Sequence, residues 1–347
     1  MTKVYFKPVS AEAGSDEIRD TAAALLSEFL RAENIPLEKK IPLKVHFGEK
    51  GNRTYLVPQT YDGIIDLLEK QGVECFFAET SVLYGGERFE REKHLKLASL
   101  HGFTRIPVVI ADGAHGEDAC DIPVKFRHFK YCSLARVLAE SPQTLVLSHF
   151  KGHMLAGFGG AIKQLSMGFA SKGGKMSMHL GVKPRIRNFK CRRCRLCLSR
   201  CQREAITISE KKSFIDPEKC VGCGACFSIC PHHAVSVLTM KGLWNALFHG
   251  RFFREKLVEY AYASHHGKRN IYMNFAVSVT PGCDCEPRPM RKCVENIGIF
   301  ISSDPVAADS ACWDAVAEKG RKFRGAEQLI YAEKIGLGSR KYELVRS

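Results

Sequence analysis

The chain has 347 residues, of which 45% are hydrophobic and 26% charged, a balance that excludes a disordered or fibrous protein. No apolar run approaches the roughly 18 residues of a membrane span, and the first residues lack the apolar stretch of a secretion signal, so we expect a cytoplasmic protein without membrane association. The net charge of +15, from 52 basic and 37 acidic side chains, favours an acidic partner or surface.

Strand and helix patterns alternate over the first 150 residues. Residues 3–6 predict a short strand, and apolar residues at three- and four-residue steps from Ile18 to Leu30 predict a helix. Further strands are predicted at 41–49, 74–80, 105–112 and 144–150, and further helices at 61–71, 94–100 and 134–140. This alternation predicts an α/β fold with a helix-covered, mostly parallel sheet.

The pattern breaks at residues 157–175, where six glycines predict loops and one helix at 161–167. It resumes with a helix at 243–262, strands at 270–279 and 297–303, and a helix opened by Asp304 and Pro305. We therefore expect the first part of an α/β domain at 1–182, an inserted cysteine module at 183–240, and the part that completes the α/β domain at 241–347. Three successive domains are the alternative.

The chain contains 15 cysteines, and their clustering favours a metal site in a reducing compartment over a disulfide scaffold. Two runs have the C-x2-C-x2-C-x3-C spacing of bacterial-type ferredoxins: Cys191, Cys194, Cys197 and Cys201, then Cys220, Cys223, Cys226 and Cys230. In two-cluster ferredoxins the fourth cysteine of each run binds the other cluster, so Cys230 should complete the first set and Cys201 the second. The sequence predicts two 4Fe–4S clusters in an inserted bacterial-type ferredoxin (α+β) module. Structural zinc, usually held by two separated C-x2-C pairs, is the alternative.

Residues around these cysteines also bear on the module. Gly222 and Gly224 let the backbone approach sulfur, whereas Gln202 replaces the proline that usually follows the fourth cysteine. Six basic residues crowd the first run: Lys190, Arg192, Arg193, Arg195, Arg200 and Arg203. They would partly offset cluster charge and could dock an acidic electron carrier. Nucleic-acid binding is disfavoured because no aromatic platform accompanies the charge.

Polar residues follow several predicted strands, where ligands bind in open α/β sheets. His149, Lys151 and His153 follow one strand and are the candidate catalytic residues. The candidate ligand-binding residues are His46, Glu49, Asp112 and, in the glycine-rich loop, Lys163. Taken singly, each could instead be an ordinary solvated or hydrogen-bonded residue. The residue types suit a further metal or anionic ligand without identifying it, and neither a dinucleotide fingerprint nor a P-loop is present.

The remaining cysteines allow several interpretations. Cys283 and Cys285 could bind metal, form a redox pair, or be packed thiols. Cys293 has no predicted role. The others read as small buried hydrophobic residues: Cys75, Cys120, Cys132 and Cys312.

Several stretches, in order, resemble one known family: 44–52 (KVHFGEKGN), Tyr84–Gly85, 110–113 (IADG), 147–171 (LSHFKGHMLAGFGGAIKQLSMGFAS), 282–285 (GCDC) and 297–311 (IGIFISSDPVAADSA). The chain is similar to the iron–sulfur-centre proteins of domain of unknown function 362. The resemblance implies an α/β domain with an inserted two-cluster ferredoxin module. Gln164 stands where the family usually has asparagine, and residues 286–296 also depart from its pattern.

Two functional hypotheses follow. The first is an iron–sulfur oxidoreductase, in which the clusters exchange electrons with a reaction in the α/β crevice. The second is a non-enzymatic electron-transfer or assembly protein that binds an acidic partner. A histidine and lysine crevice on α/β layers also suggests distant fold kinship with lactate-racemase-like nickel enzymes, although no matched motif supports it.

Overall fold

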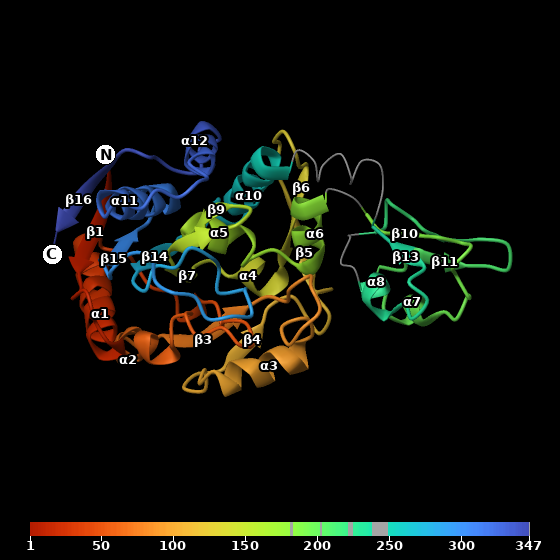
Figure 1. Ribbon diagram of the computed structural model, residues 1–347, viewed down its shortest axis with the longest axis horizontal. Coiled ribbons are helices and arrows are strands. Elements are labelled where there is room, and N and C mark those ends of the chain that lie inside the picture. The colour runs from red at the N-terminus through yellow and green to blue at the C-terminus, as the bar shows by residue number, and fades with distance from the viewer. Residues whose placement is uncertain (181–182, 202, 221–224, 238–248, 347) are drawn as a thin grey trace.

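The computed structural model describes residues 1–180, 183–201, 203–220, 225–237 and 249–346 (Figure 1). The expectations for Gln202, Gly222, Cys223, Gly224 and the first turn of the helix at 243–262 concern positions outside the described residues. None of the described helices is both long and apolar enough to cross a membrane.

A central sheet of eight strands forms the core of the larger part of the molecule, in the order β16-β1-β15-β14-β7-β2-β3-β4. Only β15 runs against its neighbours, so the prediction of a mostly parallel α/β sheet is confirmed. Strands from both ends of the chain lie side by side in this sheet, with β1 between β16 and β15. The bounds are β1 (Thr2–Pro8), β2 (Lys40–Lys44), β3 (Glu74–Glu79), β4 (Val108–Ile110), β7 (Leu145–His149), β14 (Ile271–Ala276), β15 (Gly298–Ser302) and β16 (Tyr342–Arg346).

Helices cover both faces of the sheet because its central strands are apolar on both sides. In β14, Met273 and Phe275 pack with the cluster under α1 (Ser15–Ala32), α2 (Asp62–Lys70) and α3 (Arg91–Leu100). Tyr272 and Ala276 point to the opposite face, as the alternation of a strand requires. That face is covered by α5 (Ala161–Ser166), α10 (His249–His265), α11 (Pro305–Glu318) and α12 (Glu327–Lys334). The side chain of Asp304 caps α11, as predicted.

The strand predicted at 41–49 ends at Lys44 and the strand predicted at 105–112 is limited to Val108–Ile110, and two predicted helical regions also differ from the structure. The helix predicted at 134–140 begins later, as α4 (Arg136–Glu140), because Leu134 belongs to β6 (Tyr131–Ala135), which pairs with β5 (Ala119–Pro123). The glycine-rich stretch, expected to end in loop, continues into α6 (Lys172–Leu180). Glycine is needed inside α6, since a Cβ on Gly174 would lie 2.3 Å from the carbonyl oxygen of Ser133.

Residues 185–236 contain a small unit with its own apolar cluster, seen at the right of Figure 1. Its described elements are β10 (Arg185–Ile186), α7 (Leu196–Ser199), β11 (Ile206–Ile208), β12 (Ser213–Ile215), α8 (Ala225–Ile229) and β13 (Val235–Ser236). β10 pairs with β13, and β11 pairs with β12, both antiparallel. Among the described helices, α6 precedes this unit and α10 follows it, both in the larger part.

Candidate functional site

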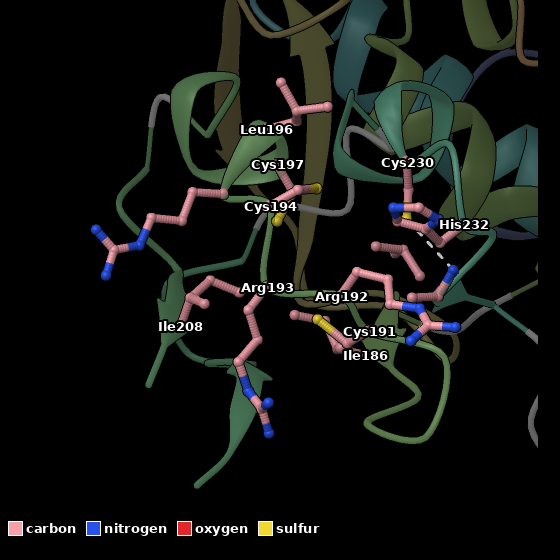
Figure 2. A pocket seen from close by; sticks show the side chains of 13 residues that line it. Ile186, Cys191, Arg192, Arg193, Cys194, Leu196, Cys197, Ile208, Cys230 and His232 are labelled. Atoms are coloured by element: carbon pink, nitrogen blue, oxygen red, sulfur yellow. Dashed lines mark hydrogen bonds between the residues drawn. The ribbon is translucent and has the colours of Figure 1, made fainter. Parts of the chain in front are cut away.

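Four cysteines of the small unit line one hollow, which Figure 2 shows. They are Cys191, Cys194 and Cys197 from the first run and Cys230 from the end of the second. Cys201, the fourth cysteine of the first run, is not among the lining residues. The described side chains therefore bring together the crossed group that the spacing predicts, and not the four consecutive cysteines.

The ends of the two cysteine runs have the same backbone geometry. The N–H of Ala205 donates to the sulfur of Cys201, and the N–H of Ala234 donates to the sulfur of Cys230, both at 3.3 Å. Three residues after each of these cysteines the backbone is left-handed, with φ of 49° at Glu204 and 48° at His233. Such N–H donors stabilise thiolates and tune a bound metal group. The internal repeat is therefore structural as well as a matter of spacing.

The second group of cysteines is described in part. Cys220 and Cys226 are buried, Cys201 is half-buried, and Cys223 lies outside the described residues. Arg192, Arg193 and Arg195 of the first run are exposed. The nearby Arg200 guanidinium is hydrogen-bonded to the His115 ring of the larger part.

The larger part contains a cavity of about 320 Å³ at the carboxyl ends of its parallel strands. Its walls include His46 after β2, Glu79 at the end of β3, Lys163 of α5, and Cys283 and Cys285 after β14. His153 belongs to β8 (Lys151–His153), which pairs with β9 (Gly157–Gly159), and it also lines the cavity. Open α/β sheets bind ligands at this edge.

The helices that flank the small unit also reach this cavity. α6 contributes Lys175 and His179, and α10 contributes Phe253. The rings of His179 and Phe253 lie 4.9 Å apart, centre to centre. The chain therefore leaves and re-enters the larger part beside the cavity.

The candidate residues do not all share one crevice. His149 and Lys151 line a separate small hollow of about 20 Å³, which shares His46 and Lys163 with the main cavity. Glu49 lines neither and instead accepts a hydrogen bond from the Tyr84 hydroxyl at 2.7 Å. Asp112 is fully buried and also lines neither; one oxygen accepts the N–H of Ser81 at 2.9 Å, and the other has no hydrogen-bond partner among the described residues.

Two lining residues of the small hollow, His149 and Lys151, share a buried partner, Asp284, which the sequence patterns did not indicate. Both carboxylate oxygens of Asp284 lie 3.1 Å from Nδ1 of His149, and one of them also accepts a hydrogen bond from Lys151. Burial opposes ionisation of Asp284, but the charges of Lys151 and His149 outweigh it and lower the pKa of this carboxyl. Nε2 of His149 faces the carbonyl oxygen of Val277 at 2.9 Å. The group is a buried carboxylate with two proton-bearing neighbours.

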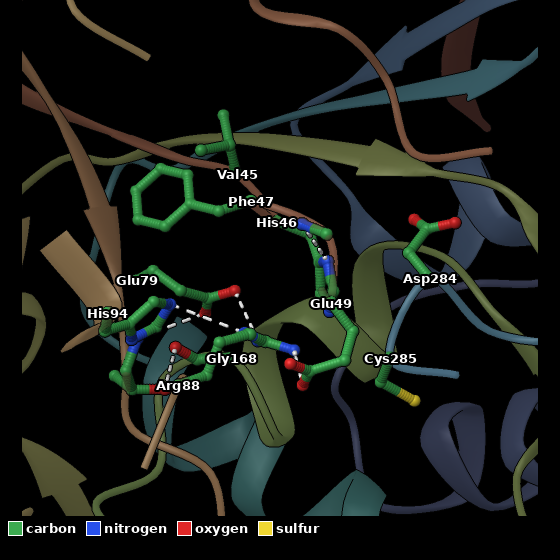
Figure 3. A network of polar contacts seen from close by, with 12 residues as sticks. Val45, His46, Phe47, Glu49, Glu79, Arg88, His94, Gly168, Asp284 and Cys285 are labelled. Atoms are coloured by element: carbon green, nitrogen blue, oxygen red, sulfur yellow. Dashed lines mark hydrogen bonds and ion pairs between the residues drawn. The ribbon is translucent and has the colours of Figure 1, made fainter. Parts of the chain in front are cut away.

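A second buried charge network forms part of the cavity wall (Figure 3). Glu79 lies 2.8 Å from the Lys44 ammonium and 3.0 Å from the Arg88 guanidinium, and each of the three side chains is at most 3% exposed. Arg88 also lies 3.8 Å from Glu49. Burial raises the pKa of Glu79, yet the two cations more than compensate and the pKa falls. In the sequence Lys44 lies within a strand pattern of apolar residues, which gives no indication of this network.

The cavity combines neutral imidazoles with charged amines. Burial lowers the pKa of His46 to about 3, with Arg88 adding to the effect, and Nδ1 accepts the N–H of Gly48, so the ring proton resides on Nε2. Burial, aided by Lys163, also lowers the pKa of His153. Burial opposes the charge of Lys163, but nearby Cys283 raises its pKa overall, whereas burial lowers the pKa of Lys175 to about 7. Lys163 is therefore positively charged and could contact a bound anion.

Asp309 fixes the N-terminal end of α5, the helix that carries Lys163. The Asp309 carboxylate accepts the N–H groups of Ala161 at 2.6 Å and Ile162 at 3.0 Å, the first two of the helix. A Cβ on Gly160 would lie 2.2 Å from an oxygen of Asp309, so the close approach requires glycine. The glycine-rich segment thus positions a cation at the cavity.

One described group of side chains could hold a metal ion. The ligand atoms of His153, Cys283 and Cys285 lie within 4.8 Å of one another. A hydrogen bond from the Cys285 thiol, together with Lys163, lowers the pKa of Cys283 despite its burial. Sequence reasoning had noted the two cysteines and the histidine separately. His153 and Cys283 are 130 positions apart in the chain, so the sequence does not show that they are neighbours.

The other cysteines behave largely as predicted. Cys75, Cys132 and Cys312 are buried, with exposed fractions of 5% or less. Cys120 is only half-buried, because its thiol lies at the edge of β5 next to the Arg136 guanidinium at 3.1 Å. The prediction for Cys120 was therefore wrong.

A family model described as "Domain of unknown function (DUF362)" matches residues 41–314. None of the curated proteins compared with the chain matches it. Among solved structures, the chain is similar to a protein from Thermotoga maritima, with 9% identity and a TM-score of 0.46, covering 89% of this chain and 60% of that one. It is also similar to the lactate racemase apoprotein from Thermoanaerobacterium thermosaccharolyticum, with 12% identity and a TM-score of 0.44, covering 92% and 58%. The chain spans less than two thirds of the length of either.

Proposed function

The chain belongs to the DUF362 family, and from that premise we propose that it is an iron–sulfur redox enzyme. In this proposal the cysteine-rich unit holds two 4Fe–4S clusters, and the cavity of the larger part holds the substrate. The observation that carries it is the hollow lined by Cys191, Cys194, Cys197 and Cys230.

The cysteines fit two clusters better than they fit structural zinc. The first cluster would be held by the four cysteines of the hollow, and the second by Cys201 with Cys220, Cys223 and Cys226. Zinc needs a single group of four ligands, whereas the crossed grouping leaves a second complete group. The N–H donors to Cys201 and Cys230 suit thiolates that carry cluster charge. Bound 4Fe–4S clusters supply one-electron transfer.

The proposal includes the domain division: residues 1–182 and 241–347 would form one α/β domain, and residues 183–240 an inserted ferredoxin-type module. Two facts support it. Strands from both flanking segments share one sheet. The described part of the module has its own apolar cluster.

The cavity residues would bind an anionic substrate and manage its protons. Lys163 supplies positive charge, and the Nε2–H of the neutral His46 is a hydrogen-bond donor. Asp284 would keep His149 and Lys151 in fixed orientation at the small hollow, which shares His46 and Lys163 with the cavity and where Lys151 could pass a proton. His153 would contact the bound molecule from β8. Glu49 acts through Arg88 and Tyr84, and Asp112 has no contact with the cavity, so neither is retained as a ligand-binding residue.

Anaerobic purification tests the cluster assignment. We expect about eight iron and eight sulfide per chain in the wild type and about four of each in Cys194→Ser. Cys293→Ser, outside both cysteine groups, should keep all eight. Colourless protein that contains zinc and no sulfide would refute the proposal.

The substrate site is tested by the small molecules that the anaerobically purified protein retains. Mass spectrometry should find a small anion in the wild type and in Lys70→Met, an exposed lysine of α2, and far less in Lys163→Met with unchanged iron and sulfide. Equal retention by all three proteins contradicts an anion site at Lys163.

The exposed arginines of the first cysteine run favour a second candidate, an electron-transfer protein without its own substrate. Arg192, Arg193 and Arg195 surround cysteines of the hollow and would dock an acidic redox partner. In that case reduction by an acidic ferredoxin would slow as salt rises. The rate of this reduction would be unaffected by Lys163→Met, and the protein would convert no small molecule.

A further inference from the structure

His153, Cys283 and Cys285 reach the same wall of the cavity from two separate segments. His153 belongs to β8, and the cysteines lie in the loop that follows β14. Their ligand atoms lie within 4.8 Å of one another, and all three residues line the 320 Å³ cavity. One imidazole and two thiols at this separation can bind a single ion.

The cysteine loop is held rigidly. The N–H of Cys283 donates to the carboxylate of Glu286 at 3.2 Å, and the hydroxyl of Thr280 donates to the carbonyl oxygen of Gly282 at 2.9 Å. The carbonyl oxygen of Asp284 accepts the N–H of Glu49 at 3.0 Å, which ties the loop to the segment after β2. A fixed loop keeps both sulfur atoms in place before any ligand arrives.

The surroundings of Cys283 are those of a metal-bound thiolate. The N–H of Cys285 donates to its sulfur at 3.4 Å, and the Lys163 ammonium lies 3.6 Å from it. Donors of this kind orient a ligating sulfur and stabilise its charge. Cys283 is 2% exposed, so its sulfur is reached only through the cavity.

The histidine ring is oriented as well. The N–H groups of Leu155 and Ala156 point at Nδ1 of His153, at 3.2 and 3.0 Å. Nε2 is therefore the nitrogen left for a metal. Two alternatives for Cys283 and Cys285, packed thiols and a disulfide, do not explain why an imidazole from a separate segment lies beside both sulfur atoms.

We propose that His153, Cys283 and Cys285 bind one borderline-soft divalent metal ion of the Zn²⁺ type, separate from the cysteine-rich unit. Two thiolates and an imidazole suit such an ion, and three protein ligands leave a fourth position open. That position faces the cavity, where Lys163 stands beside Cys283. An oxygen donor with negative charge, such as a carboxylate, is the class of molecule that would complete the coordination.

The test uses the full-length protein with its iron and sulfide content counted, one equivalent of Zn²⁺ as the probe, and desalting before analysis. We expect one Zn²⁺ per chain in the wild type, and X-ray absorption at the zinc edge should find two sulfur atoms and at least one nitrogen. Cys293→Ser, a cysteine outside the group, should behave identically. His153→Gln and Cys285→Ser should weaken Zn²⁺ binding at least tenfold without changing the iron and sulfide content.

Two results would overturn the proposal. One is a wild type that retains no Zn²⁺, including a wild type in which Cys283 and Cys285 are found as a disulfide. The other is Zn²⁺ held equally by wild type and both ligand variants. A zinc edge in the wild type that shows four sulfur atoms and no nitrogen would also overturn the proposal, and this measurement does not depend on the folding of a variant. Loss of zinc with iron and sulfide intact would leave the cluster proposal standing.

Discussion

Removal of the Glu79 charge should destabilise the protein strongly, because it leaves the buried Lys44 ammonium without a carboxylate partner and the buried Arg88 guanidinium with only the more distant Glu49. Glu79 accepts from Lys44 at 2.8 Å and from Arg88 at 3.0 Å, and the three side chains are at most 3% exposed. At these separations each contact is worth several kcal/mol with an effective dielectric constant of about 20. Since burial has already cost part of that energy, we expect Glu79→Gln to lower the free energy of unfolding by about 3–5 kcal/mol.

The same two strands supply a matched control. Lys40 of β2 and Glu74 of β3 form an ion pair whose side chains are 58% and 63% exposed. Glu74→Gln should cost less than about 1 kcal/mol, because water screens the exposed pair. Lys44→Met added to Glu79→Gln should recover part of the loss, since one of the uncompensated cations is then absent.

Urea denaturation followed by circular dichroism measures these differences as shifts of the midpoint at constant slope. The reasoning is refuted if Glu79→Gln costs no more than Glu74→Gln. It is equally refuted if the double variant is less stable than Glu79→Gln alone by the full cost of a second lost contact.

Three further predictions concern single residues. The pKa of His46 in the folded protein, about 3, lies below its unfolded value, so its contribution to the free energy of unfolding is complete above about pH 6.5 and is lost as pH falls toward 3. Urea titrations from pH 7 to 4 should therefore show a free energy of unfolding that depends less on pH in His46→Gln than in the wild type, by up to about 1.4 kcal/mol per pH unit. Gly157→Ala should lower the free energy of unfolding by at least about 1–3 kcal/mol, because φ is 92° and the new Cβ would lie 2.0 Å from the Arg324 carbonyl oxygen. In thermal unfolding the control Gly85→Ala, whose new Cβ would have nothing within 4 Å, should be near neutral, and an equal loss of stability in both variants would contradict this explanation. Asp304→Ala should cost about 1–2 kcal/mol through the lost cap of α11, whereas Asp304→Asn should keep most of the stability; an equal loss in both variants would count against capping as the cause.

The sequence was most informative where a feature is local in the chain. Apolar spacing located α1 and α2, and the Asp304–Pro305 pair located the start of α11. Cysteine spacing predicted that Cys230 would join the first run, and these residues do line one hollow. In each case the residues that decide the structure lie within about 40 positions of one another.

Contacts between distant segments were not predictable in this way. The residues next to Asp284 in the sequence do not indicate that it contacts His149, because the two residues are 135 positions apart. Lys44 lies between apolar residues in the sequence, and its charge is stable in the interior because Glu79 of the adjacent strand forms an ion pair with it. The one local feature of Asp284 is its position between two cysteines, which draws attention to the thiols as ligands and not to the carboxylate.

The interval along the chain between the cysteine-rich unit and the cavity wall has a consequence for biosynthesis. The described elements of the unit end at Ser236, whereas the cavity needs Cys283, Cys285 and Glu286. A ribosome therefore delivers the complete unit about 50 residues before it delivers the last wall of the cavity, a delay of several seconds at usual elongation rates. Insertion of the proposed clusters into the unit could thus precede closure of the pocket during translation.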